Sequence, residues 1–231
     1  MTAFFVTSSG TGVGKTLVTA ALTFQLRNAG RGVRALKPIL SGYDETDAKT
    51  SDSGVLLSAL GKDPTPEAVA LITPWRFATP LSPDMAASRE NRDIDFTALC
   101  DFCRSQIDAA GAENQITLIE GVGGVLVPLT GRETVADWIA ALDMKPVLVV
   151  GSYLGALSHG LTAWEAMKAR GISPVSVIIV QSRDAPVSLD ETHTTLARFL
   201  PPLPIVALPR LAPADRIWET APDLLPALAM V

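Results

Sequence analysis

Apolar and polar residues alternate in blocks along this chain, and the blocks predict strands and helices that follow one another. The strand candidates are short and nearly continuous apolar runs, as expected of parallel strands buried on both faces. They are Ala3–Val6, Val33–Leu36, Ile116–Ile119, Pro146–Val150, Val175–Val180 and Ile205–Leu208. The helix candidates are Lys15–Ala29, Asp52–Leu60, Phe96–Ala109, Val135–Leu142, Ala156–Arg170 and Leu189–Phe199. The alternation predicts an α/β fold: a doubly wound, mainly parallel sheet with helices on both faces.

Glycine and proline mark the ends of these elements. Four glycines stand where helix C-terminal caps are expected, namely Gly30, Gly61, Gly111 and Gly171. The Pro-rich region from Pro64 to Pro83 also carries Trp75, Phe77 and Leu81, which favours an ordered excursion over a linker. No internal repeat or low-complexity tract divides the chain, so residues 1–231 are expected to form a single nucleotide-binding domain.

The stretch Ser8–Thr16, S-S-G-T-G-V-G-K-T, lies between the first strand and the first helix. This context is typical of a phosphate-binding loop, and it predicts the phosphate-loop nucleoside triphosphatase type of fold. Glycines let the backbone N–H groups approach a polyphosphate, Lys15 can reach the β- and γ-phosphates, and the Thr16 hydroxyl can ligate Mg²⁺. The usual pattern begins with glycine, and Ser9 stands there instead. A glycine-rich turn that only caps a helix is the alternative.

Other candidate residues lie at strand ends, where open α/β sheets bind ligands. Lys37 and Ser41 follow the second strand in K-P-I-L-S-G, and Pro38 keeps Lys37 extended at the sheet edge. A surface lysine is an equally good interpretation from spacing alone. Glu120 ends the strand in T-L-I-E-G-V-G-G and resembles the acidic metal-binding residue of phosphate-loop enzymes. Asp52 is a weaker candidate, because a carboxylate is favourable at any helix start.

Composition limits the partners. The chain has 231 residues, 48% of them hydrophobic, and a net charge of −5, which argues against a general nucleic-acid surface. Without a bilayer-spanning run or a secretory signal, we expect no membrane association and a cytoplasmic location. Cys100 and Cys103 form a C-x-x-C whose simplest interpretation is a helix with reduced, partly buried thiols, because His159 and His193 are far away in sequence.

Several motifs together resemble the dethiobiotin synthetase family. They are V-T-S-S-G-T-G-V-G-K-T, K-P-I-L-S-G, P-W-R-F-A-T-P-L-S-P at Pro74–Pro83, E-G-V-G-G-V-L-V-P-L at Glu120–Leu129, A-D-W at Ala136–Trp138, and V-L-V-V-G-S-Y-L-G-A-L-S-H at Val147–His159. The glycine loop is common to very many proteins, whereas the ordered set is far more specific. The resemblance covers nearly the whole chain.

The resemblance implies an ATP-dependent ligase that joins CO₂ to 7,8-diaminononanoate and closes the ureido ring of dethiobiotin, releasing ADP and phosphate. One amine would become a carbamate, its oxygen would attack the γ-phosphate, and the second amine would displace phosphate. By the family pattern, Lys37 and Lys15 are catalytic and Ser41 binds substrate. Thr16, Asp52 and Glu120 match the positions that hold Mg²⁺.

The resemblance also implies where the nucleotide and the far end of the substrate bind. The nucleotide-binding positions are Gly12, Val13, Gly14, Lys15, Thr16, Leu17, Asp52, Glu120, Gly121, Val122, Gly123, Gln181, Ser182, Pro209, Arg210 and Leu211. A homodimer is implied, in which Gly155, Ala156, Leu157 and Ser158 of a neighbouring subunit bind the substrate carboxylate. Gly12, Gln181 and Arg210 depart from frequent family residues, so nucleotide preference is less secure than phosphate binding.

Two rival classes share parts of this pattern. A related amidation ligase would normally carry a glutamine-hydrolysing domain, for which this chain has no room. A partitioning ATPase of the same fold carries an extra lysine early in the glycine loop, where this chain has Ser8, Ser9, Gly10 and Thr11. Neither class needs diaminononanoate, so the reaction product would separate all three.

Overall fold

A six-stranded parallel sheet forms the centre of the chain. The computed structural model describes residues 2–228, and its strand order is β2-β5-β1-β6-β7-β8. Every neighbouring pair is parallel. The strands are β1 (Ala3–Ser8), β2 (Val33–Leu36), β5 (Ile116–Glu120), β6 (Lys145–Val150), β7 (Ser176–Val180) and β8 (Ile205–Leu208). The six strands expected from the sequence are all present, and β1 lies between β5 and β6.

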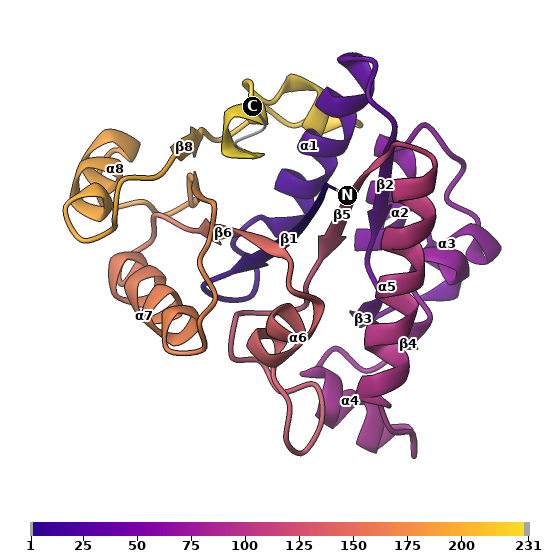
Figure 1. Cartoon of the computed structure of the whole chain (residues 1–231). Helices are drawn as coiled ribbons and strands as arrows, with labels where there is room; N and C mark the ends of the chain where they lie inside the picture. Colours follow the sequence, from indigo (N-terminus) through magenta and orange to yellow (C-terminus); the bar gives the residue numbers. More distant parts are fainter. Residues whose placement is uncertain (1, 229–231) are drawn as a thin grey trace.

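Helices cover both faces of this sheet, as predicted. They are α1 (Lys15–Asn28), α2 (Asp52–Ala59), α5 (Phe96–Ala112), α6 (Val135–Leu142), α7 (Ala156–Lys168) and α8 (Leu189–Ala197). Right-handed crossovers place α1 on one face and α5 to α8 on the other, and Figure 1 shows α1 above the sheet with α6 and α7 below it. Short 3₁₀ turns, η1 (Glu45–Asp47), η2 (Ile217–Thr220) and η3 (Leu225–Leu228), complete the described elements.

The excursion between β2 and α5 has a small sheet of its own, which the sequence pattern did not show. It contains β3 (Ile39–Ser41), α3 (Pro66–Ile72), β4 (Trp75–Phe77) and α4 (Pro83–Arg89). β3 and β4 pair in parallel, with Ile39 opposite Trp75. Strands of three residues are too short for a periodic signal. The region is ordered, as expected, and Phe77 is buried in the core.

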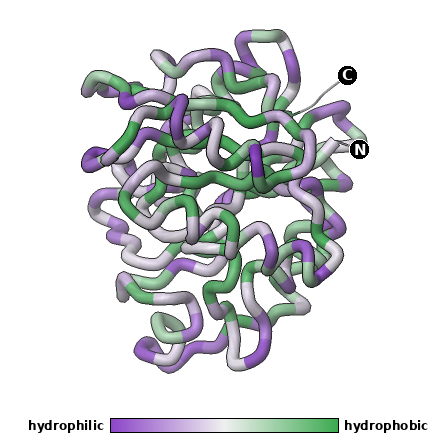
Figure 2. Tube along the Cα trace, turned by 90° about the vertical axis from the view of Figure 1, so that its left-hand side faces the viewer, coloured by the Kyte–Doolittle hydropathy of each residue, from purple (hydrophilic) through white to green (hydrophobic). Residues whose placement is uncertain are grey.

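The core lies between the central strands and the helices. Phe5 and Trp138 are fully buried and their rings meet edge to face, with centroids 4.9 Å apart. This contact fixes α6 against β1, and an aromatic pair of this kind adds about 1 kcal/mol beyond burial. The Thr134–Asp137 capping box starts the same helix. Figure 2 shows many of the apolar, green stretches of the chain in the interior and many of the polar, purple ones on the outer turns.

Three of the four predicted glycine caps are confirmed. Gly30, Gly61 and Gly171 all have positive φ and follow helices. The prediction for Gly111 is wrong, because α5 continues through it to Ala112. The residue in the left-handed conformation is Asn114, with φ of 54°. Asparagine tolerates this conformation better than other side chains with a Cβ, so it can end a helix in place of glycine.

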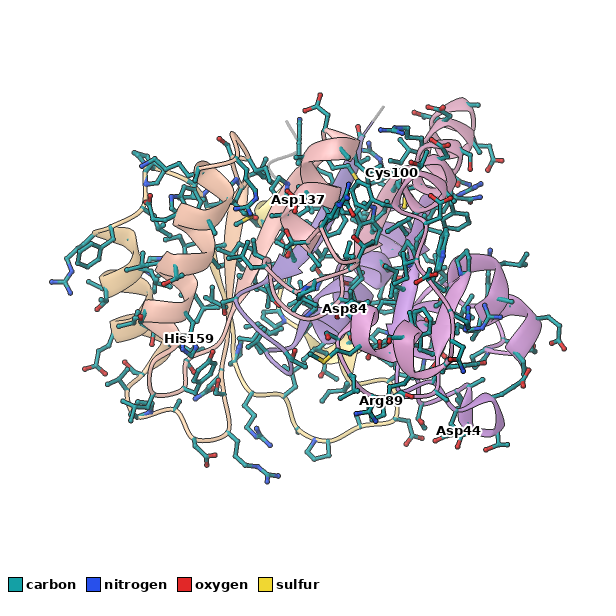
Figure 3. All side chains as sticks on the ribbon, turned by 90° about the horizontal axis from the view of Figure 1, so that it is seen from below. Asp44, Asp84, Arg89, Cys100, Asp137 and His159 are labelled. Atoms are coloured by element: carbon teal, nitrogen blue, oxygen red, sulfur yellow. The ribbon has the colours of Figure 1, made fainter. Side chains whose placement is uncertain are left out.

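The cysteine prediction is also confirmed. Cys100 and Cys103 are free and buried within α5, and burial raises the pKa of both thiols. Figure 3 shows Cys100 and His159 on separate helices, well apart. Residues 2–228 hold no cluster of three or more histidine, cysteine or acidic side chains arranged to bind a metal. No helix within that range has the length and apolar character needed to cross a membrane.

Gly54 offers a test of how α2 is positioned. A Cβ there would lie 2.1 Å from the Ala48 carbonyl oxygen, although alanine normally favours a helix by about 1 kcal/mol. We expect Gly54→Ala to lower the free energy of unfolding by roughly 1–3 kcal/mol in urea denaturation, because the backbone before α2 must shift. Gly131→Ala, with no atom within 4 Å of the added Cβ, is the control and should change stability little. A stabilised Gly54→Ala would show that the close approach is absent.

Candidate functional site

The loop between β1 and α1 has the backbone that a phosphate site needs. Gly12 and Gly14 lie in the left-handed region, with φ of 72° and 100°, and Gly14 caps the start of α1. A Cβ on Gly14 would also lie 3.0 Å from a Val180 methyl group at the end of β7. The loop therefore has the local conformation and close packing that glycine alone permits without strain.

Lys15 folds back over this loop. Its Nζ donates to the Ser8 Oγ at 2.9 Å and to the Gly123 carbonyl at 2.7 Å, with the Gly10 carbonyl at 3.4 Å. Burial, with the nearby Lys37 charge, lowers the pKa of Lys15 to about 8 despite the opposing carboxylates. The ammonium is held by neutral acceptors, so an anionic phosphate would be a stronger partner.

Ser8 is a site residue that sequence reasoning missed. The sequence pattern singled out Ser9 because it replaces the usual first glycine. The Ser9 hydroxyl is buried and has no partner among the described residues. The Ser8 hydroxyl instead contacts Lys15 and both glycine carbonyls, and the Ser8 carbonyl accepts from the Val125 N–H at 3.0 Å. In the sequence Ser8 was only the first residue of the loop stretch, after the predicted strand Ala3–Val6, whereas in the structure it is the last residue of β1. Ser8 thus joins the phosphate loop to the loop after β5.

Lys37 and the acidic residues form a second cluster beside that loop. Lys37 Nζ lies 2.6 Å from Glu120 Oε1, 3.0 Å from Asp52 Oδ2 and 2.9 Å from the Gly121 carbonyl oxygen. The Thr16 hydroxyl donates to the same Glu120 oxygen at 2.9 Å. Lys37 directly follows β2, and Thr16, Asp52 and Glu120 belong to α1, α2 and β5. Four positions separated in sequence therefore meet, including Asp52, the weaker candidate.

Charge balance dominates this cluster. Burial alone would lower the pKa of Lys37, but Glu120 and Asp52 outweigh it and raise the pKa. Burial would raise the pKa of Asp52, and Lys37 outweighs it and lowers that pKa. The ion pairs thus favour the charged forms of Lys37 and Asp52. The nearby Lys15 differs, because its pKa is lowered to about 8.

The cluster has the donor chemistry of a magnesium site. Thr16, Asp52 and Glu120 supply oxygen, which Mg²⁺ prefers, and Mg²⁺ commonly keeps waters and substrate phosphates as its other ligands. Glu120 Oε2 is buried without a hydrogen-bond partner among the described residues. An unpartnered buried carboxylate oxygen beside a phosphate loop is where a divalent cation would satisfy an unmet charge.

A cleft of about 650 Å³ opens over both clusters. Ser41 lines it, and the Ser41 hydroxyl is buried and unpartnered among residues 2–228. The segment Pro80–Pro83 and the apolar side chains of Leu40, Val122 and Val127 form the remaining walls. Val122 was predicted as a nucleotide-binding residue, whereas Thr11, Leu40, Val127 and the segment Pro80–Pro83 were not predicted as site residues, although P-L-S-P stood among the family motifs. The cleft thus combines cations with an apolar wall.

The ends of β7 and β8 bring the other nucleotide candidates together. The Gln181 side-chain carbonyl accepts from the Arg210 N–H at 3.0 Å, which leaves the Gln181 amide group as a donor. Ser182 exchanges two hydrogen bonds with Ser152, at 2.9 and 3.0 Å. Pro209 and Leu211 flank Arg210 directly after β8. Because Val180 touches Gly14, this group lies beside the phosphate loop.

The start of α7 lies elsewhere. Gly155, with φ of 96°, precedes the helix, and Ser158 is exposed. None of Gly155, Ala156, Leu157 and Ser158 lines the cleft that contains Lys37. Figure 3 shows His159 of α7 well separated from Asp84, which follows the Pro80–Pro83 wall. Within one subunit, the carboxylate candidates are therefore apart from the lysine cluster.

Comparisons with known proteins agree with this geometry. A family model described as an AAA domain matches residues 2–216. Among solved structures, the MinC:MinD cell division complex of Aquifex aeolicus matches with a TM-score of 0.55 at 15% identity, covering 95% of this chain and 86% of that one. FtsY of Thermotoga maritima matches with a TM-score of 0.52 at 13% identity, covering 98% and 66%. Likeness at this identity shows the phosphate-loop fold alone.

The curated relatives are more specific. The chain is 47% identical over 201 residues to the ATP-dependent dethiobiotin synthetase BioD of Acidiphilium cryptum (strain JF-5), covering 87% of this chain and 89% of the relative. It is 42% identical over 233 residues to the protein of that name from Caulobacter sp. (strain K31), covering 99% and 96%. Sequence, fold and cleft agree, and the chain belongs to the family of ATP-dependent dethiobiotin synthetases.

Proposed function

We propose that this chain closes the ureido ring of dethiobiotin from 7,8-diaminononanoate, CO₂ and ATP in biotin biosynthesis. The observation that carries the proposal is the convergence of Lys15, Lys37 and Ser41 on one cleft beside a phosphate loop. The relatives bear the name of this activity. The apolar wall of the cleft suits the hydrocarbon chain of the substrate, and the cations suit its reacting end.

The proposed chemistry has three balanced steps. One substrate amine attacks CO₂ and loses a proton, giving a carbamate anion. A carbamate oxygen attacks the γ-phosphorus and ADP leaves, giving a carbamic-phosphoric anhydride. The second amine attacks the carbamic carbon, phosphate leaves with the C–O electron pair, and the ring closes after loss of a proton. Each step needs a neutral amine or the meeting of two anions, and both favour a cationic site.

The residues take distinct parts in this chemistry. Lys15 binds the β- and γ-phosphates, and Lys37 stabilises the carbamate and the transferring phosphoryl group. Thr16, Asp52 and Glu120 hold Mg²⁺, which would neutralise phosphate charge. Ser41 orients the diamine end. Gly12, Val13, Gly14 and Leu17 with Gly121, Val122 and Gly123 enclose the polyphosphate, and the Gln181 amide with Ser182, Pro209, Arg210 and Leu211 receives the base.

Product analysis tests the reaction directly. The purified chain, given diaminononanoate, bicarbonate, ATP and Mg²⁺, should release dethiobiotin, ADP and phosphate in equal amounts, measured by mass spectrometry and a phosphate assay. Omission of bicarbonate is the control and should abolish all three products together. ATP hydrolysis without a ureido product would contradict the proposal and would favour a partitioning-type ATPase.

Substitution of each lysine tests the division of labour. Lys37→Ala should lower kcat by about 10²-fold or more, because it removes charge stabilisation where negative charge develops, and should change the affinity for an ATP analogue much less. Lys15→Ala is the matched comparison, because it should lower the affinity for the ATP analogue as well as the turnover rate. Equal losses of analogue affinity in both variants would place Lys37 among the nucleotide ligands only.

A homodimer would complete the site. Large exposed apolar side chains occur in the loops after β5 and β6, namely Leu126 and Leu154, and just before and on α4, namely Leu81 and Met85. Leu154 is 85% exposed and immediately precedes the left-handed Gly155. Burial of such side chains favours association of two copies. A partner's α7 start, with its helix dipole and free N–H groups, would then bind the distant substrate carboxylate.

Complementation tests the shared site. Ser158→Asp places a like charge at the carboxylate position and should weaken diaminononanoate binding while leaving ATP-analogue binding nearly unchanged. Mixed with Lys37→Ala, it should regain activity, because one site of each heterodimer would combine Lys37 of one copy with Ser158 of the other. Ser158→Asn is the neutral control. A fully active monomer by light scattering, or inactive mixed dimers, would contradict this arrangement.

A further inference from the structure

The Lys37 ammonium is fully engaged in this structure. Its three protons face three oxygen atoms, from Glu120 at 2.6 Å, Gly121 at 2.9 Å and Asp52 at 3.0 Å. Only 2% of Lys37 is exposed. An ammonium group has three donors and no acceptor, so none remains for a carbamate or a phosphoryl group. The residue assigned to catalysis is therefore held away from substrate.

The oxygens that hold Lys37 belong to the residues proposed to bind the metal. Glu120 Oε1 takes hydrogen bonds from both Lys37 and Thr16, and Asp52 takes the second ion pair. A divalent cation held by Glu120, Asp52 and Thr16, for example through the unpartnered Glu120 Oε2, would draw on the negative charge of the same carboxylates and would repel the ammonium at short range. The metal and the Lys37 ammonium thus compete for the negative charge of the same two carboxylates.

We propose that Lys37 is the resident counter-ion of the metal site and that metal binding releases it into the cleft. This inference rests on the proposed function for the role of Lys37, and on the contacts of Lys37 with Glu120 and Asp52 for the competition. Without metal, the ammonium satisfies two carboxylates that burial would otherwise penalise. When the metal takes their charge, the Lys37 side chain is left without those partners and turns to the anionic reactants. The catalytic cation is then available only when metal is bound.

Lys15 does not share this arrangement. Its acceptors are the Ser8 hydroxyl and the carbonyls of Gly10 and Gly123, none of which is a carboxylate. Its release requires only a better acceptor, such as a phosphate. Lys37 is accordingly coupled to the metal, and Lys15 to the nucleotide.

Metal binding without nucleotide tests the competition. Wild-type chain, Lys37→Met and Lys49→Met are titrated with Mn²⁺ and followed by electron paramagnetic resonance, with Mg²⁺ calorimetry as a second probe. Lys37→Met should bind metal about tenfold more tightly than wild type, because no ammonium must be displaced. Lys49→Met controls for simple removal of positive charge and should change the affinity little. Lys49 is exposed, is close to Asp52 in sequence and lines a groove that Asp52 also lines. Equal or weaker binding by Lys37→Met would overturn the proposal.

A second measurement uses the wild-type chain, in case Lys37→Met folds poorly. Reductive methylation followed by peptide mass spectrometry reports how accessible each lysine is. Mg²⁺ alone should increase methylation of Lys37 several-fold relative to Lys49 in the same molecule. Unchanged protection of Lys37 at saturating Mg²⁺ would overturn the proposal. Neither measurement contains diaminononanoate or CO₂, so their failure would leave the ring-closure proposal standing, and failure of product formation would leave this competition intact.

Discussion

The buried ion pair between Lys37 and Glu120 holds together the candidate functional site. It joins the end of β2 to the end of β5, with side-chain exposures of 3% and 0%. Desolvation makes such a pair a poor source of stability, since apolar replacements are often as stable, yet loss of one partner alone costs about 3–5 kcal/mol. A buried pair at this place is better explained by the charges it keeps ready beside the phosphate loop.

Parallel pairing brings the rest of the site to this ion pair. Because β1, β2 and β5 are adjacent and parallel, their carboxyl ends place Ser8, Lys37 and Glu120 at one edge of the sheet. Two lysines within one site would repel each other, and the structure separates their environments. Burial and the nearby Lys37 charge lower the pKa of Lys15 to about 8, whereas the carboxylates raise that of Lys37. The loops before and after these strands are then fixed by backbone contacts, such as Val125 N–H to Ser8 carbonyl.

The sequence predicted the sheet and the phosphate loop because both have strong local signals. Buried parallel strands read as continuous apolar runs, and a glycine loop between a strand and a helix is specific in context. Asp52 had no such signal, since a carboxylate at a helix start is explained locally, and only the family resemblance raised it. Its distance of 3.0 Å from Lys37 arises from tertiary packing of α2. β3 and the Ser8 contacts likewise depend on pairing between segments that are distant in sequence. The Asn114 cap was missed because asparagine stands where a glycine was expected.

The fold of this protein does not by itself indicate the chemistry of its candidate site. The sheet is shared with MinD and FtsY proteins at low identity, and a fold of this kind hosts many activities. The residues of the candidate site lie at the strand ends. At the end of β1 the buried Ser8 hydroxyl contacts Lys15. A second cation comes from β2, as Lys37, on the side of the cleft where Ser41 and the apolar wall lie. Placing that charge beside a substrate-sized cleft, away from the loop itself, suits chemistry on a second molecule better than hydrolysis of the nucleotide alone.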